Sequence, residues 1–133
     1  MIGVLLVTHG EIGTALLASA TQILGAQRQV ATLSVWRQDD PDDLVLRARE
    51  LMEQIDADDG VLVLTDIFGA TPGNVVSKLL QDGRVEGVSG VSLPMLLRVL
   101  TSRNGSLTSA VQRAMSGGAE GVVHMNDDRC CDA

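Results

Sequence analysis

The chain has 133 residues, of which 45% are hydrophobic and only 2% aromatic, and its formal net charge is -7 at pH 7. A chain of this length forms one domain, and its core must be aliphatic. The acidic charge and the lack of a basic stripe exclude nucleic-acid binding. No apolar run reaches the roughly 18 residues of a membrane span, so we expect no membrane insertion. The N-terminus lacks basic residues and a cleavage site, so we expect no signal peptide.

The N-terminal segment predicts a buried strand that ends at a histidine. Residues 1–10 read MIGVLLVTHG, a continuous apolar run closed by Thr8-His9-Gly10. Short β-branched runs of this kind are typical of parallel strands buried on both faces. His9 therefore lies at the carboxyl end of a central strand. In open α/β sheets this edge is where ligands bind.

Helical and strand patterns alternate along the rest of the chain. The predicted elements are a helix over 11–24, a strand over 30–36, a helix over 41–55, a strand over 61–65, a helix from 72 to about 80, a strand over 85–91, a helix from 94 to about 102, a short helix over 107–115 ended by Gly117-Gly118, and a short strand over 121–125. Asp40 and Thr71 are the predicted N-caps of the helices that open with Pro41 and Pro72. The residues predicted to share one face of the first helix are Ile12, Leu16, Ser19, Ala20 and Ile23.

This alternation predicts an α/β fold, a doubly wound and mostly parallel sheet. The common small version has the strand order 2-1-3-4. In that order the chain leaves the first strand on one side and returns on the other, so a crevice opens between the carboxyl ends of strands 1 and 3. These ends carry His9 and Asp66, which we expect to face each other.

The loops around His9 and Asp66 favour phosphate chemistry. A carboxylate that accepts a hydrogen bond from one ring nitrogen leaves the other free as a base, a metal ligand or a nucleophile. Gly10 allows close backbone approach, Thr71 adds a hydroxyl, and helix N-termini offer unpaired N–H groups. Neither loop contains Lys or Arg. A phosphoryl group carried on His9 and held by backbone dipoles fits these features.

Each of these residues also has a purely structural interpretation. His9 can be an ordinary loop histidine, and Asp66 can cap its own turn. Thr71 can serve only as an N-cap, and Phe68 can be a lid or packing residue. His124, on the last predicted strand, is expected to be structural.

The two cysteines, Cys130 and Cys131, are adjacent in a polar tail. Neighbouring cysteines cannot form an ordinary structural disulfide, which fits a reducing cytoplasm. Together with His124 they match no standard zinc pattern, so no metal site is expected. Their role stays open.

Three segments occur in order along the chain: Thr8-His9-Gly10, LTDIFGATPGN over 64–74, and GVSLPML over 90–96. With these segments the chain resembles the enzyme IIA domain of the mannose-type bacterial phosphotransferase system. The resemblance covers residues 1–125, which leaves 126–133 as a flexible C-terminal tail.

The resemblance implies a cytoplasmic phosphocarrier. His9 would accept a phosphoryl group from the carrier protein HPr and pass it to a separate EIIB protein for sugar uptake and phosphorylation, or the phosphorylation state would serve regulation. Asp66 would orient His9, Thr71 takes the place of a phosphate-contacting Ser, and Phe68 stands where a Trp is often found; with Gly10 these form the expected phosphate site. The resemblance also implies a homodimer that exchanges the short C-terminal strand, and no cofactor.

Other classes of protein fit the same topology less well. A receiver domain needs an acidic pair after the first strand, where this chain has Thr8 and His9, and a later Lys that is not placed here. A flavin-binding protein needs a Ser/Thr-rich phosphate loop and aromatic residues, but the chain has no Tyr and one Trp. A non-enzymatic interaction or regulatory module stays open as the alternative function.

Overall fold

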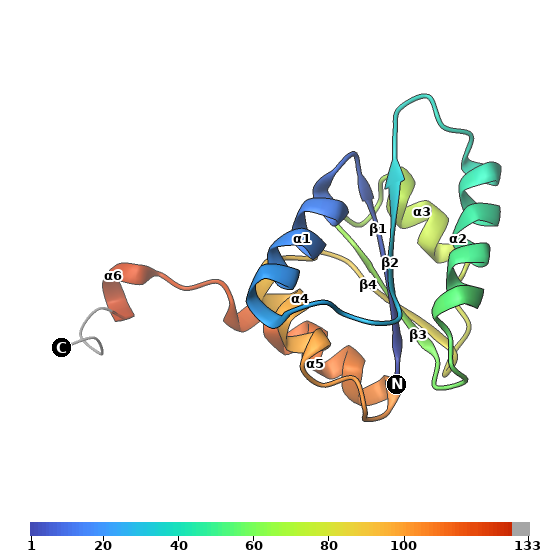
Figure 1. Ribbon diagram of the computed structural model, residues 1–133. Helices are drawn as coiled ribbons and strands as arrows, with labels where there is room; N and C mark the ends of the chain where they lie inside the picture. The colour runs from blue at the N-terminus through green and yellow to red at the C-terminus, as the bar shows by residue number, and fades with distance from the viewer. Residues whose placement is uncertain (129–133) are drawn as a thin grey trace.

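The computed structural model describes residues 1–128. The elements in chain order are β1 (Gly3–His9), α1 (Ile12–Leu24), β2 (Val30–Val35), α2 (Pro41–Ile55), β3 (Val61–Thr65), α3 (Thr71–Ser77), β4 (Val85–Val88), α4 (Leu93–Leu100), α5 (Leu107–Glu120) and α6 (Met125–Asp128). Figure 1 shows a central sheet with helices on both faces and α6 lying away from this body.

The four strands form one parallel sheet in the order β2-β1-β3-β4, which confirms the predicted α/β fold and strand order. Every residue of β3 is buried, and so is every residue of β1 except His9. The register pairs Val7 with Thr65. His9 and Asp66 therefore emerge at the same edge, from the two central strands.

Two aliphatic layers fix the helices to the sheet. One layer joins the sheet to α1, α4 and α5, and the other joins it to α2 and α3; the same division is visible in Figure 1. Because side chains alternate along a strand, Leu6 of β1 packs in the first layer while Leu5 and Val7 pack in the second. Burial on both faces is what the continuous apolar run of β1 predicted.

The face of α1 that packs on the sheet matches the predicted apolar face only in part. Ile12 is 45% exposed and Ile23 is 59% exposed, so these two residues do not pack in the core. The residues that face the core are Gly13, Leu16, Leu17, Ala20 and Leu24. The backbone N–H of Gly13 donates to Thr8 Oγ1 at 2.7 Å, and a Cβ at Gly13 would lie 2.9 Å from that oxygen. This close approach sets the rotation of the helix on the sheet.

Several boundaries also differ from the sequence prediction. Helix α5 does not stop near Met115 but runs through Gly117-Gly118 to Glu120. A Cβ at Gly117 would lie 3.1 Å from Arg98 Cβ and 3.2 Å from Met95 Cα of α4. This glycine therefore marks close helix packing rather than a helix end. Helix α3 and strand β4 are shorter than predicted, and α4 begins one residue earlier, after the Ser92 N-cap.

The C-terminal segment forms no strand in the single chain. Residues 122–124 have no regular structure, and α6 follows at Met125–Asp128. His124 is exposed and its Nδ1 lies 3.0 Å from Asp127 Oδ2; its place on a strand exchanged in a dimer stays a prediction. Cys130 and Cys131 lie outside the described residues. Over residues 1–128, no helix is long and apolar enough to cross a membrane.

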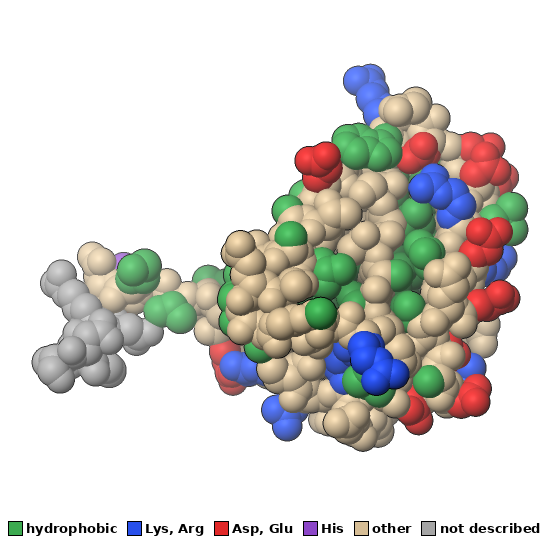
Figure 2. Space-filling model, in the orientation of Figure 1, with side chains coloured by type: hydrophobic (Ala, Val, Ile, Leu, Met, Phe, Trp, Pro, Cys, Tyr) green, Lys and Arg blue, Asp and Glu red, His purple; other side chains and the backbone are tan. Residues whose placement is uncertain are grey.

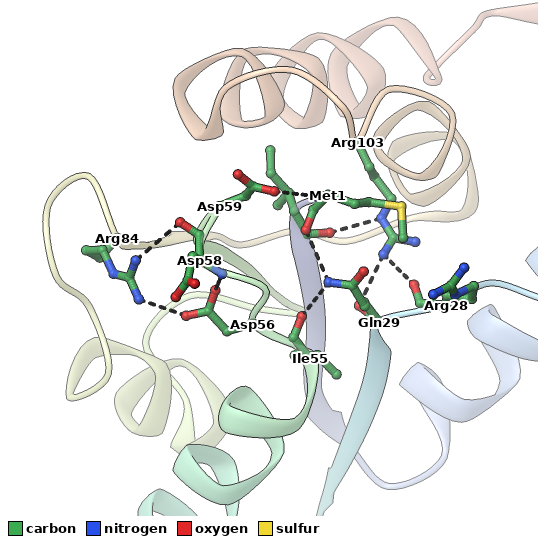
Figure 3. Close-up of polar contacts among 10 residues, drawn as sticks. Met1, Arg28, Gln29, Ile55, Asp56, Asp58, Asp59, Arg84 and Arg103 are labelled. Atoms are coloured by element: carbon green, nitrogen blue, oxygen red, sulfur yellow. Dashed lines mark hydrogen bonds and ion pairs between the residues drawn. The ribbon is translucent and has the colours of Figure 1, made fainter.

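Arg103 connects three segments at the amino end of the sheet, opposite His9 (Figure 3). Its side chain is almost fully buried. Nε donates to the Ile2 carbonyl at 3.1 Å, and Nη2 donates to the carbonyls of Gln29, at 3.2 Å, and of Arg28. The Gln29 amide in turn donates to the Ile55 carbonyl at 2.9 Å. One guanidinium thus bonds the buried carbonyl that leads into β1 and two part-buried carbonyls that lead into β2.

We expect Arg103→Met to lower the free energy of unfolding by about 1–3 kcal/mol, because it leaves the buried Ile2 carbonyl without its side-chain donor. Arg113→Met is the matched control, since Arg113 is exposed on α5. Urea denaturation of both variants measures the difference. Equal stability of the two variants would show that the Arg103 hydrogen bonds do not support the fold.

Candidate active site

His9 is the last residue of β1, and its side chain is 47% exposed. The next residue, Gly10, has φ +48°, a conformation that glycine adopts more readily than other residues. The Gly10 N–H donates to the Val35 carbonyl at 2.9 Å, and a Cβ at Gly10 would lie 3.3 Å from the Trp36 ring. Gly10 therefore turns the chain sharply into α1 and leaves His9 at the open edge of the sheet.

Asp66 holds His9 through both its backbone and its ring. Asp66 Oδ2 accepts from the His9 backbone N–H at 3.1 Å and lies 2.8 Å from His9 Nδ1. The other oxygen, Oδ1, accepts from the Ile67 N–H at 3.1 Å and from Thr65 Oγ1 at 3.4 Å. Asp66 thus caps its own turn and also contacts His9. The two interpretations of Asp66, a turn cap and a partner of His9, therefore both apply.

The charge of Asp66 follows from these contacts. Burial alone raises the pKa of Asp66, but hydrogen bonds from the His9 ring, from the His9 backbone and from its own loop outweigh burial and lower the pKa below its usual range. An ionised Asp66 can only accept, so Nδ1 carries the proton and Nε2 keeps a lone pair. Within residues 1–128, nothing hydrogen-bonds Nε2 of His9.

Thr71 lies in the same pocket as His9. It is the first residue of α3, and the N-cap is Ala70, which has extended backbone angles and no side-chain cap. The prediction that Thr71 is the N-cap was therefore wrong. The Asn74 N–H donates to the Ala70 carbonyl at 2.9 Å, which closes the first turn without the Thr71 hydroxyl. That hydroxyl is available on the side of His9.

Phe68 does not line the pocket of His9 and Thr71. Its side chain is 82% exposed, and it borders a groove between α3 and β4 together with Val76 and Leu80. The loop that carries Asp66 thus has two sides. Asp66 and Thr71 face His9, whereas Phe68 extends outward beside them.

The loop between β2 and α2 completes the pocket, and the sequence analysis did not include it. This loop contributes Trp36, Arg37 and Asp39 to the lining. The strand order contained the necessary signal, because β2 is the parallel neighbour of β1 and its carboxyl end must reach the same edge. The loop has no motif of its own, so only the predicted strand order could have identified it.

Potential metal ligands do not gather at this site or elsewhere in the described part of the chain, where no cluster of three His, Cys, Asp or Glu residues occurs.

Fold and site together define a doubly wound α/β domain with an exposed, carboxylate-held histidine at the point where the strand order reverses. Residues 3–115 match the model of the EIIA-man family, described as the PTS system fructose IIA component. The chain therefore belongs to the mannose-type EIIA family of sugar phosphotransferase system components.

Named relatives agree with this assignment. The chain is 31% identical over 124 residues to the mannose-specific EIIAB component of the phosphotransferase system from Escherichia coli (strain K12), covering 91% of this chain but only 38% of that protein. It is 32% identical over 104 residues to the fructose-specific EIIA component from Bacillus subtilis (strain 168), covering 77% of this chain and 71% of that protein.

A solved structure shows the same fold over the whole domain. The crystal structure of the phosphotransferase system component EIIA from Streptococcus agalactiae superposes with a TM-score of 0.86 at 27% identity. The match covers 96% of this chain and 99% of that one.

The lowered pKa of Asp66 predicts how stability depends on pH. In the unfolded chain an Asp has a pKa of about 3.9, so ionised Asp66 stabilises the folded state above that pH, and this contribution is lost as the pH falls through the lower folded pKa. We expect Asp66→Asn to cost about 1–3 kcal/mol at pH 7. The gap to the wild type should shrink below a pH of about 4.

Urea denaturation from pH 7 to pH 3 measures this gap. Asp82→Asn, at an exposed turn, is the control and should follow the wild type throughout. A gap that stays constant over this pH range would contradict an ionised, hydrogen-bonded Asp66.

Proposed function

We propose that this chain is a phosphocarrier that takes a phosphoryl group from phospho-HPr onto His9 and passes it to an EIIB partner. The observation that supports this most directly is the 2.8 Å contact between His9 Nδ1 and Asp66 Oδ2, which leaves Nε2 as the nucleophilic nitrogen. The output is sugar uptake and phosphorylation, or regulation through the phosphorylation state. This function places the chain in the cytoplasm.

The transfer itself needs positioning more than acid–base chemistry. The lone pair of Nε2 forms the new bond to phosphorus as the bond to the donor breaks, and the donor atom keeps the electron pair of that bond. The Nδ1 proton stays on the ring. The phosphorylated ring then carries positive charge, which the ionised Asp66 carboxylate stabilises. No cofactor or metal takes part, because the phosphoryl group is held covalently.

The phosphoryl oxygens need partners in the pocket beside Nε2. Thr71 lines this pocket with His9, and its hydroxyl does not cap α3. Gly10, the residue after His9, has no side chain that would block the approach of a phosphoryl group. These groups can contact the oxygens after transfer, which supports the phosphate roles assigned to them. Phe68, farther out on the same loop, is better placed to contact a docked protein than the phosphoryl group.

A carrier must bind two proteins at the same histidine, and the loops that surround His9 expose apolar side chains. Large apolar residues that are 45–82% exposed here are Ile12, Trp36, Ile67 and Phe68. They come from the β1–α1, β2–α2 and β3–α3 connections and their helix ends, all at the carboxyl edge of the sheet. Exposed aromatic and aliphatic groups of this kind anchor protein interfaces.

We expect His9→Ala to abolish labelling by phosphoenolpyruvate, the first enzyme of the system and HPr, because no other side chain supplies the nucleophile. The wild type should carry one phosphoryl group per chain, labile in acid and stable in base. His124→Ala is the control and should be labelled normally, since the chain has only these two histidines. Label that persists in His9→Ala, or that appears on Asp66, would refute the mechanism.

The same assay separates the carrier from the alternative, a non-enzymatic interaction module, because such a module would show no labelling in the wild type. Asp66→Asn should label about tenfold to a thousandfold more slowly, since an amide can donate to the ring and disfavour the reactive tautomer. Near-normal rates in this variant would reduce Asp66 to its role in the turn.

We further propose a homodimer in which the C-terminal segment of each chain pairs with the other copy. Strand β4 ends the sheet on one side, so its outer edge lacks a partner strand within residues 1–128. Figure 2 shows apolar side chains on the projecting C-terminal segment. Val122 is 85% exposed and Val123 is 48% exposed. Burial against a second copy would account for a segment that exposes these apolar side chains in the single chain.

We expect the intact protein to be a dimer at micromolar concentration, and a chain cut after Glu120 to be a monomer or an aggregate. The cut follows Glu120 because α5 extends to that residue. Multi-angle light scattering measures both masses. A truncated chain that remains a dimer would show that the segment is not the interface.

A further inference from the structure

An arginine from outside the two loops that hold His9 and Asp66 reaches the pocket of His9. Arg37, in the β2–α2 connection, lines this pocket together with His9 and Thr71. Its side chain is exposed and makes no hydrogen bond or ion pair with any residue of the described chain. Among the lining residues it is the one Lys or Arg.

The backbone that carries Arg37 is held in place. The Trp36 N–H donates to Asp39 Oδ2 at 2.8 Å, and the Asp39 N–H donates to the Trp36 carbonyl at 3.0 Å, which closes a tight turn around Arg37. The Trp36 ring lies against Gly10, so this turn is packed directly on the loop that follows His9. The backbone at Arg37 is therefore held in place, whereas its side chain is exposed and has no hydrogen-bond partner among residues 1–128.

The electrostatics of the pocket favour a cation near His9 once His9 is phosphorylated. A phosphoryl group on a side chain carries about -1.5 to -2 charges at pH 7. The chain has a net charge of -7, Asp66 contacts His9, and Asp39 lies on the pocket wall. Arginine matches phosphoryl oxygens with two parallel N–H donors, which makes it well suited to this geometry.

We propose that Arg37 is a phosphoryl-binding residue that contacts the oxygens of the group on His9 Nε2 during transfer and afterwards. This inference rests on the proposed phosphocarrier function and deepens it by supplying the cation that the two loops lack. In the step, the Nε2–phosphorus bond forms as the bond between phosphorus and the donor nitrogen breaks, and the donor nitrogen keeps the electron pair. Arg37 exchanges no proton; it stabilises charge on the phosphoryl oxygens.

The test compares Arg37→Gln with Arg47→Gln in the full chain. Arg47 is also exposed, lies on the neighbouring helix α2 and has no partner among residues 1–128, but it borders a different pocket with Ser34 and Glu50. Both variants remove one positive charge, so long-range effects are matched. Two donors are used: phospho-HPr, and phosphoramidate, a small molecule that transfers its phosphoryl group and releases ammonia without any docked protein.

We expect Arg37→Gln to slow labelling by about tenfold to a hundredfold with both donors, within the range for loss of one charge-stabilising donor. Arg37→Lys should recover part of the rate, because it keeps the charge but not the paired N–H groups. The phosphorus NMR resonance of phosphorylated His9 should shift in Arg37→Gln. Arg47→Gln should match the wild type in rate and resonance.

Each other outcome has a distinct meaning. A wild type that neither donor labels would refute the phosphocarrier function itself. A labelled wild type with equal rates and resonances in the two glutamine variants would overturn only the assignment of Arg37. If Arg37→Gln is labelled more slowly by phospho-HPr but at the normal rate by phosphoramidate, the assignment of Arg37 is also overturned. Arg37 would then contact the donor protein instead of the phosphoryl group.

Discussion

The site depends on the hydrogen bonds between His9 and Asp66. They join the ends of β1 and β3, the two strands at which the strand order reverses. The backbone contact positions the chain at His9, and the ring contact selects the nitrogen that stays free. Both require the parallel register that places Val7 beside Thr65, and this register is held by side chains buried on both faces of the sheet. The aliphatic core therefore determines which ring nitrogen can react.

The contacts that stabilise the fold and the residues of the site lie at opposite ends of the strands. At the amino end of the sheet, Arg103 is buried and satisfies carbonyl groups of neighbouring segments. At the carboxyl end, the connecting loops leave His9 half exposed and keep large apolar side chains in solvent. The proposed carrier needs this division, because its histidine must be accessible to partner proteins while the strand that holds it stays rigid. The exposed loops are supported by the packed elements beneath them and by hydrogen bonds within the loops.

The parts of the fold that the sequence predicted are those with a strong local signal. The runs of β1 and β3 are long, apolar and β-branched, and the order 2-1-3-4 then placed His9 opposite Asp66. The failures share a cause, which is close packing of one element on another. The close approach of Gly13 to Thr8 rotated α1, and the packing of Gly117 against Met95 let α5 continue through a glycine pair. The β2–α2 loop lines the site without any motif, so only the completed sheet could show that Trp36 and Arg37 belong to it.

In the proposed carrier, His9 has two requirements, one before and one after transfer, that oppose each other electrostatically. Before transfer, His9 needs an ionised carboxylate at Nδ1 so that Nε2 keeps its lone pair. After transfer, that same carboxylate stabilises the charged ring but repels the phosphoryl oxygens, in a chain whose net charge is already negative. The Thr71 hydroxyl can donate a hydrogen bond, but it carries no charge to offset this repulsion. A mobile cation on a fixed turn resolves the conflict, because it can approach the oxygens when the group is present and withdraw when a partner docks. The placement of Arg37 in the connection after β2, the strand next to β1, rather than in either loop that holds His9, allows both.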